Sequence, residues 1–329
     1  MNDSELVRIL SSIVLQSTPL AIAVCGETIT ERAGVVNLSL DGTMLLSAMV
    51  GFVAGLLSKS VWVGFLAAAG VGALFAFIIA FGSIRLRKDQ FAVGFVLTLL
   101  GDELSAFLGQ NYTRIPGQKV SHLGIPLLKD IPILGPIFFD HDPVVYFAFI
   151  LVGITWWWMF RTQHGLRLRS AGERPEAGFV RGINVNRLRY IYTLVGGSLV
   201  GIAGAAYSLD IKLGWSEGHT RGLGWIALAI VIFGGWSPIR GAFGALLFGA
   251  SKALAAALQR SFPEESVVVF NATPWVLMIA VLLLVGSDAT DRLIVLAPRR
   301  FQSRLRQLLR VRPPGALGTL FIPGESGGE

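Results

Sequence analysis

The sequence predicts an all-α protein, a polytopic bundle of about nine membrane-spanning helices. Of its 329 residues, 53% are hydrophobic and only 15% are charged, and the mean hydropathy is +0.63. A soluble domain needs a larger charged surface, whereas a bilayer core of about 30 Å requires roughly 20 apolar residues for each helical crossing. The chain therefore has room for several spans with short connections and for no sizeable soluble domain.

Apolar runs of helical length justify these spans one by one. They cover residues 7–26, 36–57, 60–83, 91–109, 144–160, 190–209, 223–236, 241–259 and 266–286. The run 223–236 is short for a full crossing and ends at Gly234-Gly235-Trp236-Ser237-Pro238. A full span and a broken or re-entrant helix are therefore both open at this position.

Clustered arginines predict the orientation of the bundle. The stretches 161–189 and 292–312 each hold seven arginines, together half of the 28 cationic side chains. Because cationic loops stay on the cytoplasmic side during insertion, nine crossings place the amino terminus outside and the carboxyl terminus inside. A nucleic-acid partner is not expected, since the cations do not form a groove interleaved with exposed aromatic residues.

The same pattern predicts the domain organisation. A transmembrane domain covers residues 1–297, with an outer loop over 110–143 and a cytoplasmic loop over 161–189. Residues 298–329 form a cytoplasmic tail that is basic at first and then disordered, because it is rich in glycine, proline and charge. The basic part is expected to lie on the anionic lipids of the inner leaflet.

Several kinds of chemistry are not expected in this chain. The single cysteine, Cys25, excludes a disulfide within the chain and a multi-cysteine metal site, and the four histidines lack HExxH spacing. No GxxxxGK[ST] phosphate loop occurs, so ATP would have to be bound by another chain. We expect no metal, no bound cofactor and no catalytic residue here.

The polar segment 165–185 is the most informative part of the sequence. We expect a short helix within it, because Pro175 suits the first turn, Glu176 complements the positive end of the helix dipole and Gly182 suits the left-handed position after the last turn. Phe179 and Val180 are then apolar residues on a solvent-facing helix, as a partner-binding surface requires. The alternative is an ordinary solvated loop retained inside by its charge.

Four stretches of the chain resemble the permease subunits of ABC importers of the branched-chain amino acid, ribose and nucleoside family. They are 31–46 (ERAGVVNLSLDGTMLL), 89–100 (DQFAVGFVLTLL), 166–205, which contains the polar segment from its second residue on, and 224–238 (GWIALAIVIFGGWSP). The first is most similar to the smaller permease of nucleoside and simple-sugar importers. The four occur in the family's order and span nearly the whole chain.

This resemblance implies a mechanism and a set of partners. A second permease completes the path, most simply as a heterodimer, an extracytoplasmic substrate-binding protein delivers a nucleoside or sugar-like solute, and a cytoplasmic ABC ATPase binds ATP and Mg²⁺. The membrane is a bacterial-type inner (plasma) membrane. The residues that the resemblance assigns to contact with the ATPase are Gly172, Glu173, Pro175, Glu176, Phe179, Arg181 and Gly182.

Polar and aromatic groups at membrane depth are the candidates for the substrate path, because each is costly there unless it is paired or lines water. They are Asn37, Asp41, Phe91, Asp102, Glu103, Trp225 and Asn271. For Asn37 and Asp41 the alternative is a structural role at the entrance of a helix, with Asp41 meeting the helix dipole or Arg32. For Asp102 and Glu103, where the family usually has small or neutral residues, the alternative is a helix end that reaches water.

Small residues predict close helix packing. Gly196, Gly197, Gly201 and Gly204 form one such face, and Gly241, Gly244 and Gly249 form another. The competing function is an ion-coupled secondary transporter or channel, in which Asp41, Asp102 or Glu103 would bind the coupling ion. The exposed Phe179 argues against it.

Overall fold

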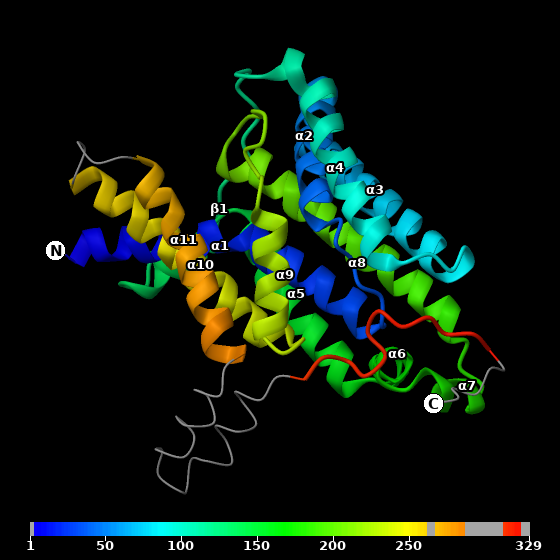
Figure 1. Cartoon of the computed structure of the whole chain (residues 1–329). Coiled ribbons are helices and arrows are strands. Elements are labelled where there is room, and N and C mark those ends of the chain that lie inside the picture. Colours follow the sequence, from blue (N-terminus) through cyan, green and yellow to red (C-terminus); the bar gives the residue numbers. More distant parts are fainter. Residues whose placement is uncertain (1–2, 262–266, 287–311, 324–329) are drawn as a thin grey trace, which may run out of the picture.

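The computed structural model describes residues 3–261, 267–286 and 312–323, and within them the chain is almost entirely helical (Figure 1). The α-helices are α1 (Asp3–Arg32), α2 (Leu40–Ser58), α3 (Val61–Ala80), α4 (Gln90–Gly109), α5 (Pro143–Arg161), α6 (Gln163–Glu173), α7 (Pro175–Val180), α8 (Val185–Ala206), α9 (Leu223–Phe233), α10 (Pro238–Ser261) and α11 (Val267–Gly286). Short helical turns extend four of the connections, namely η1 (Phe81–Arg85), η2 (Gln110–Tyr112), η3 (Gly135–Phe139) and η4 (Tyr207–Ile211). Strands β1 (Leu123–Gly124) and β2 (Asp140–His141) form a minimal antiparallel pair in the loop 110–143.

Each of the nine predicted apolar runs overlaps a described helix, which confirms a helical membrane protein. Seven helical segments of the described chain are long and apolar enough to cross a membrane, and the shorter apolar segments Leu223–Phe233 and Ala272–Val281 account for the other two runs. Helix α9 has 11 residues, about 16 Å at 1.5 Å per residue, which is roughly half of the hydrocarbon thickness. The run predicted to be short is therefore a half-length helix.

Helix α8 lies at the centre of the bundle and packs against α1, α2 and α3. Its glycines allow this, because a Cβ added at Gly196 would collide with the backbone of Gly26 in α1, and one added at Gly201 would collide with the backbone of Ala68 in α3. Without side chains at these positions the helix backbones approach closely and gain dispersion energy over a long contact. The predicted packing face is thus used on several sides of one helix.

The second predicted glycine face lies on α10. A Cβ at Gly249 would meet the backbone of Ile13 in α1, and one at Gly244 would meet the side chains of Ile230 and Phe233 in α9. Helix α10 therefore packs between the first helix and the half-length helix, as the contacts of α10 with both elements show.

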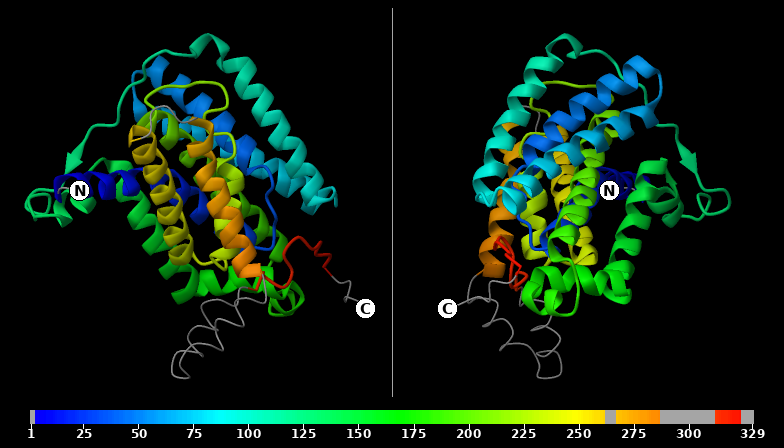
Figure 2. Two further views of the ribbon diagram at one scale, coloured as in Figure 1. Left: turned by 60° about the vertical axis from the view of Figure 1, so that its left-hand side comes forward. Right: turned by 90° about the vertical axis from the view of Figure 1, so that its right-hand side faces the viewer.

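Helices α6 and α7 and the segment 312–323 lie together at one end of the bundle. Figures 1 and 2 show α6, α7 and the segment 312–323 (red) together at this end. The connection after α1 also lies there, since Gly34 O accepts from Gly318 N. The loop between α9 and α10 is held at the same end by Arg32, which contacts both Trp236 of that loop and Glu173 of α6. We call this end of the molecule the α7 end.

The segment 312–323 differs from the disordered tail that the sequence predicts. Its backbone is hydrogen-bonded to the bundle, with Ala316 N donating to Gly172 O at 2.8 Å and Gly318 N donating to Gly34 O at 3.1 Å. Phe321 is buried. The segment is held because fixed backbone partners and one apolar anchor offset the entropy of ordering it. The predicted basic stretch lies almost wholly outside the described residues.

Candidate functional site

The polar segment forms two helices where the sequence predicts one. Helices α6 and α7 are separated by Arg174, whose backbone is not helical. Pro175 occupies the first position of α7, where its missing N–H leaves no donor unpaired. Gly182 has φ +79°, the left-handed conformation that glycine adopts without strain after a helix.

The outward side of α7 carries the exposed apolar surface that the sequence predicts. Phe179 is 44% exposed and Val180 is 85% exposed. Glu176 and Arg181 are exposed beside them. The surface therefore combines a large apolar contact with charges at its border, which is typical of a protein-binding site.

The remaining predicted residues face the bundle. A Cβ at Gly172 would collide with the backbone carbonyl of Arg32, so α6 touches the end of α1 at this glycine. Glu173 forms an ion pair with Arg32, with 3.1 Å between Oε1 and Nη1. Its Oε2 accepts a hydrogen bond from the backbone N–H of Gly315 at 3.2 Å.

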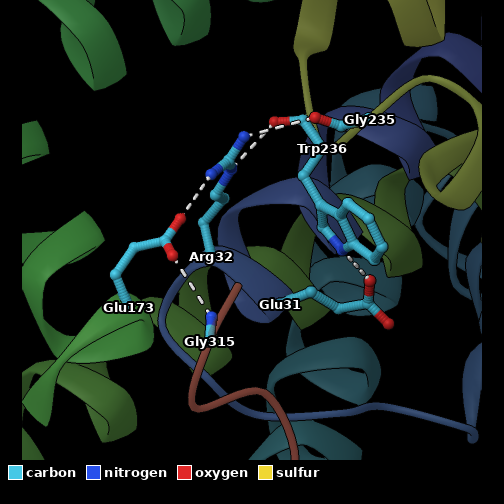
Figure 3. A network of polar contacts seen from close by, with 6 residues as sticks. All are labelled: Glu31, Arg32, Glu173, Gly235, Trp236 and Gly315. Carbon is cyan, nitrogen blue, oxygen red and sulfur yellow. Dashed lines mark hydrogen bonds and ion pairs between the residues drawn. The ribbon is translucent and has the colours of Figure 1, made fainter. Parts of the chain in front are cut away.

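Arg32 joins three separate elements at the α7 end (Figure 3). Besides the ion pair to α6, its Nε donates to the carbonyl of Trp236 at 3.0 Å and its Nη2 donates to the carbonyl of Gly235 at 3.2 Å. The indole N–H of Trp236 in turn donates to the carboxylate of Glu31. A displacement of α6 therefore acts directly on the end of α1 and on the loop that connects α9 to α10.

A concave surface lies beside α7, formed by α6, α7 and the beginning of α8. Its volume is about 1190 Å³, and five arginines line it with a single carboxylate, Glu173. They are Arg167, Arg169, Arg174, Arg181 and Arg187. A partner that covers this surface must supply negative charge.

Asp41, predicted on the substrate path or at a helix entrance, caps a helix other than its own. Its Oδ1 accepts the backbone N–H groups of Gly222 at 2.8 Å and of Gly224 at 3.0 Å, at the amino terminus of α9. A carboxylate at this position satisfies unpaired N–H groups and meets the positive end of the helix dipole. The predicted alternative contact between Asp41 and Arg32 is not formed, because Arg32 binds Glu173, Gly235 and Trp236.

Asn37 supports the turn that leads into α2. Its Oδ1 accepts hydrogen bonds from Ser39 N at 3.0 Å and Ser39 Oγ at 2.7 Å, and its Nδ2 lies 3.4 Å from Glu27 Oε2. All three side chains are buried. Glu27 is a buried carboxylate of α1 that is not among the predicted residues, although its position four residues before Glu31 on one helix is a readable signal.

Asp102 pairs with Arg221 of the loop before α9, with 2.9 Å between Oδ1 and Nη2. This hydrogen bond and the negative charge raise the pKa of Arg221 above its ordinary value. Lys252 of α10 contacts Tyr207, with 3.4 Å between Nζ and the phenol oxygen. Glu103 is exposed on α4.

The other predicted path residues do not gather at one place. Phe91 is 50% exposed and lies at the α7 end, where its ring is near Gly318. Trp225 lies on α9, one residue after the Gly224 whose amide Asp41 caps. Asn271 lies in α11, and its side chain is outside the described residues.

Within the described ranges, no group of three or more histidine, cysteine or acidic side chains is arranged to hold a metal ion. The polar groups of the bundle are held instead by backbone amides, carbonyls and arginines. The chemistry available at the α7 end is therefore recognition by an exposed apolar surface and arginines, with Arg32 linking that surface to the bundle.

Comparison with known proteins agrees with this arrangement. The family model described as "Branched-chain amino acid transport system / permease component" matches residues 9–286. The chain is similar to the putative glucose ABC transporter permease protein TsgC13 of Haloferax volcanii (36% identity over 250 residues, 75% of this chain and 76% of the relative). It is also similar to the nucleoside ABC transporter permease protein NupC of Lactococcus lactis (38% over 259 residues, 75% and 81%) and the guanosine ABC transporter permease protein NupQ of Bacillus subtilis (34% over 299 residues, 84% and 93%).

Proposed function

Because this chain belongs to the family of permease components of branched-chain amino acid transport systems, we propose that it is the membrane-spanning subunit of an ATP-driven importer. It forms part of the path for a nucleoside or a related sugar-like solute across the inner (plasma) membrane. ATP hydrolysis takes place on a separate cytoplasmic ATPase that binds at the α7 end. The observation that carries this proposal is the exposed apolar face of α7, connected through Glu173 and Arg32 to the transmembrane helices.

The link from α7 to the bundle supports a mechanical role for this end. ATPase closure displaces α7 and α6, and the Glu173–Arg32 contact transmits the displacement to α1 and to the loop before α10. The binding energy of the ATPase then shifts the population between two packed states of the bundle. Glycine-mediated contacts along α8 allow this, since smooth helix surfaces can slide without large side chains interlocking.

The names of the relatives support the proposed cargo. The names of two of the three relatives include nucleoside or guanosine, and the name of the third includes glucose. A nucleoside contains a sugar, so one class of polar, ring-containing solute covers all three. The aromatic and polar residues near the amino terminus of α9, including Trp225, suit a ligand with both a flat apolar face and hydroxyl groups.

Relatives also support a second, different permease as the partner in the membrane. Lactococcus lactis has NupB, another nucleoside ABC transporter permease protein, which is 29% identical to this chain over 114 residues. Bacillus subtilis has NupP, another guanosine ABC transporter permease protein, which is 22% identical over 274 residues. Two unequal permeases named for one cargo in one organism favour a heterodimer.

Purification of the chain from its native membrane in mild detergent tests the assembly. We expect an ABC ATPase, a second permease and an exported binding protein to copurify. Uptake of labelled guanosine and glucose into cells should require the ATPase and stop when ATP is depleted. Recovery of the chain alone, together with uptake that depends on an ion gradient and is unchanged by ATP depletion, would contradict the proposal.

Replacement of Phe179 with Asp tests the role of α7. A carboxylate forced into an apolar cleft of the ATPase costs several kcal/mol, so ATP-dependent uptake should fall by about tenfold or more while the chain still inserts in the membrane. The matched control is Leu127→Asp, which makes the same change at a residue that is 87% exposed in the outer loop. Normal uptake in the Phe179 variant would remove α7 from the coupling mechanism.

A further inference from the structure

We propose that residues 312–323, the C-terminal segment, complete the ATPase-docking surface by forming one wall of a pocket that receives an apolar side chain of the ATPase. The inference rests on the proposed function, because that function supplies the partner. It adds a second element to the docking surface, far from α7 in the sequence.

The first argument is that the C-terminal segment is attached to the elements that carry the docking surface. Ala316 N donates to the carbonyl of Gly172 at the end of α6, at 2.8 Å. Gly315 N donates to the carboxylate of Glu173, which also binds Arg32. The segment therefore shares its anchor points with the Arg32 junction shown in Figure 3.

The second argument is the buried side chain of Arg189, which is 1% exposed. Its Nη1 donates to the carbonyl of Thr319 at 2.7 Å, and its Nη2 approaches the carbonyls of Ala171 at 3.3 Å and Ala316 at 3.5 Å. A buried guanidinium requires acceptors, and two of these three carbonyls belong to the C-terminal segment. The segment is thus part of the folded α7 end and is specified by an arginine of α8.

The third argument is the contact between Phe321 and Phe179. Phe321 is 7% exposed and packs with Ala171 and Val185. Its ring meets that of Phe179 edge to face, with centroids 5.8 Å apart and planes at 61°. Edge-to-face pairs favour one relative orientation, so Phe321 holds the exposed ring of Phe179 in a fixed position.

A pocket of about 220 Å³ lies between α7, the beginning of α8 and the C-terminal segment. Its apolar lining comes from Phe179, Ile183, Val185, Phe321 and Pro323. An apolar cavity of about 150 Å³ is large enough to bind benzene, so this pocket admits one aromatic or branched aliphatic side chain. Phe179 belongs to the pocket and to the exposed face of α7, which makes the two surfaces continuous.

Charge identifies the occupant as a partner protein rather than a second copy of this chain. The adjoining concave surface carries the five arginines named above, and two such surfaces would repel each other. A protein that covers both regions must place an apolar side chain beside acidic groups. The ATPase of the proposed function approaches this face of α7, so we expect it to place an apolar side chain beside acidic groups there.

Two exposed prolines of the C-terminal segment provide a matched pair of variants. Pro323 lines the pocket, whereas Pro313 is exposed at the beginning of the segment and does not line it. Pro323→Asp puts a carboxylate into the apolar pocket, so the amount of ATPase retained on the purified complex should fall by about tenfold or more. Pro313→Asp should retain the ATPase as the wild type does. Equal retention in the two variants overturns the inference.

Shortened chains provide the second measurement. A chain that ends after residue 311 lacks the segment, and one that ends after residue 323 keeps it. The first should lose the ATPase and the second should retain it. The two are compared at equal amounts of permease extracted from the membrane and purified by size-exclusion chromatography. If the shorter chain does not insert, the proline pair alone decides.

The Phe179→Asp variant separates this inference from the proposed function. Loss of the ATPase in Phe179→Asp together with full retention in Pro323→Asp would overturn the role of the C-terminal segment and leave the docking of α7 intact. Retention in both variants would contradict the docking of an ATPase at the α7 end and the inference with it. Loss in both, with retention in Pro313→Asp, supports both.

Discussion

At the scale of single residues, Arg32 connects more elements of the α7 end than the other residues discussed above. Its side chain is 13% exposed and binds a carboxylate and two carbonyls on separate elements. Hydrogen bonds from a charged donor contribute about 1.5–3 kcal/mol each, and the flat guanidinium can hold several acceptors in one plane. Its partner Glu173 is 46% exposed, so water can replace most of the hydrogen bonds that this carboxylate accepts.

We expect the two partners of this ion pair to differ in their effect on stability. Glu173→Ala should lower the free energy of unfolding by less than about 1 kcal/mol, because the exposed carboxylate contributes little to a solvent-screened pair. Arg32→Ala should cost about 2–4 kcal/mol, since two backbone carbonyls also lose their donor. Thermal unfolding of the purified variants in one detergent measures both, and equal costs would contradict the junction described here.

His219 predicts a pH dependence at the opposite end of the bundle. Its Nδ1 donates to the carbonyl of Ser216 at 2.6 Å, and its Nε2 accepts from Ser208 Oγ at 2.9 Å, so the neutral ring fits this site. Burial, with a smaller effect from the charge of Lys212, lowers the pKa of His219 below its ordinary value. The unfolded chain therefore binds this proton at a higher pH than the folded chain.

The sign of the effect follows from that difference. As pH falls below the ordinary histidine pKa of about 6.5, the unfolded state gains protons first, and folding stability is lost. We expect thermal stability to decrease between pH 7.5 and 5, and to decrease less in His219→Gln, whose side chain stays neutral. An identical pH profile for the two proteins would show that His219 does not contribute.

At the scale of elements, α9 depends on α2 for its stability. An 11-residue helix is marginal by itself, and its first N–H groups need partners that lipid does not supply. Asp41 provides them from α2. A Cβ at Gly224 would collide with the backbone of Leu40 and Asp41, so glycine is needed for this close approach.

Substitutions of Asp41 separate its structural role from contact with substrate. Asp41→Ala should cost about 1 kcal/mol of stability, within the 0.5–2 kcal/mol range of lost helix caps, and Asp41→Asn should cost less because its amide oxygen still accepts both hydrogen bonds. Thermal unfolding and uptake are measured on the same variants. Abolished uptake in a fully stable Asp41→Asn protein would favour contact with substrate over capping.

At the scale of the whole molecule, the arrangement of the two ends predicts which loops face which side of the membrane. Residues 59 and 88 lie in exposed connections separated by a single span, α3 with η1. With the α7 end in the cytoplasm, the first connection is outside and the second is inside.

Labelling with a membrane-impermeant maleimide tests this orientation. The natural chain suits the experiment because its one cysteine, Cys25, is buried. Lys59→Cys should react in intact cells, and Lys88→Cys should react only after the membrane is opened. The reverse pattern would invert the bundle and place α7 where no cytoplasmic ATPase could reach it.

The elements were readable from sequence because each has a local cause. Twenty-residue apolar runs require helices in lipid, and Pro175 and Gly182 mark the ends of α7 through their own backbone preferences. Helix α6 was missed, although Pro175 disfavours the helical conformation at Arg174 and so indicates the break between α6 and α7. Packing of Gly172 against the end of α1 accompanies that break.

The partners of the polar residues were readable only in part. The sequence indicates that Asp41 and Asp102 need compensation in a membrane, but Asp41 is compensated by amides 181 and 183 residues away and Asp102 by an arginine 119 residues away. Nothing in local spacing favours the amides of Gly222 and Gly224 over Arg32 as the partners of Asp41. The contacts of residues 312–323 were missed for the same reason, although Phe321 in a glycine- and proline-rich tail is a signal.

The sequence by itself therefore determined a helical membrane protein, the approximate positions of its spans, and an exposed apolar site on the polar loop 161–189. These depend on hydrophobic runs, helix-end residues and charge distribution, which act over one or two helical turns. Only the tertiary structure decided that Arg32 joins α6 to the α9–α10 loop, that Asp41 caps α9, and that residues 312–323 lie beside α7. Each of those contacts pairs groups from distant parts of the chain, and long-range pairing is specified by the packing of the whole bundle.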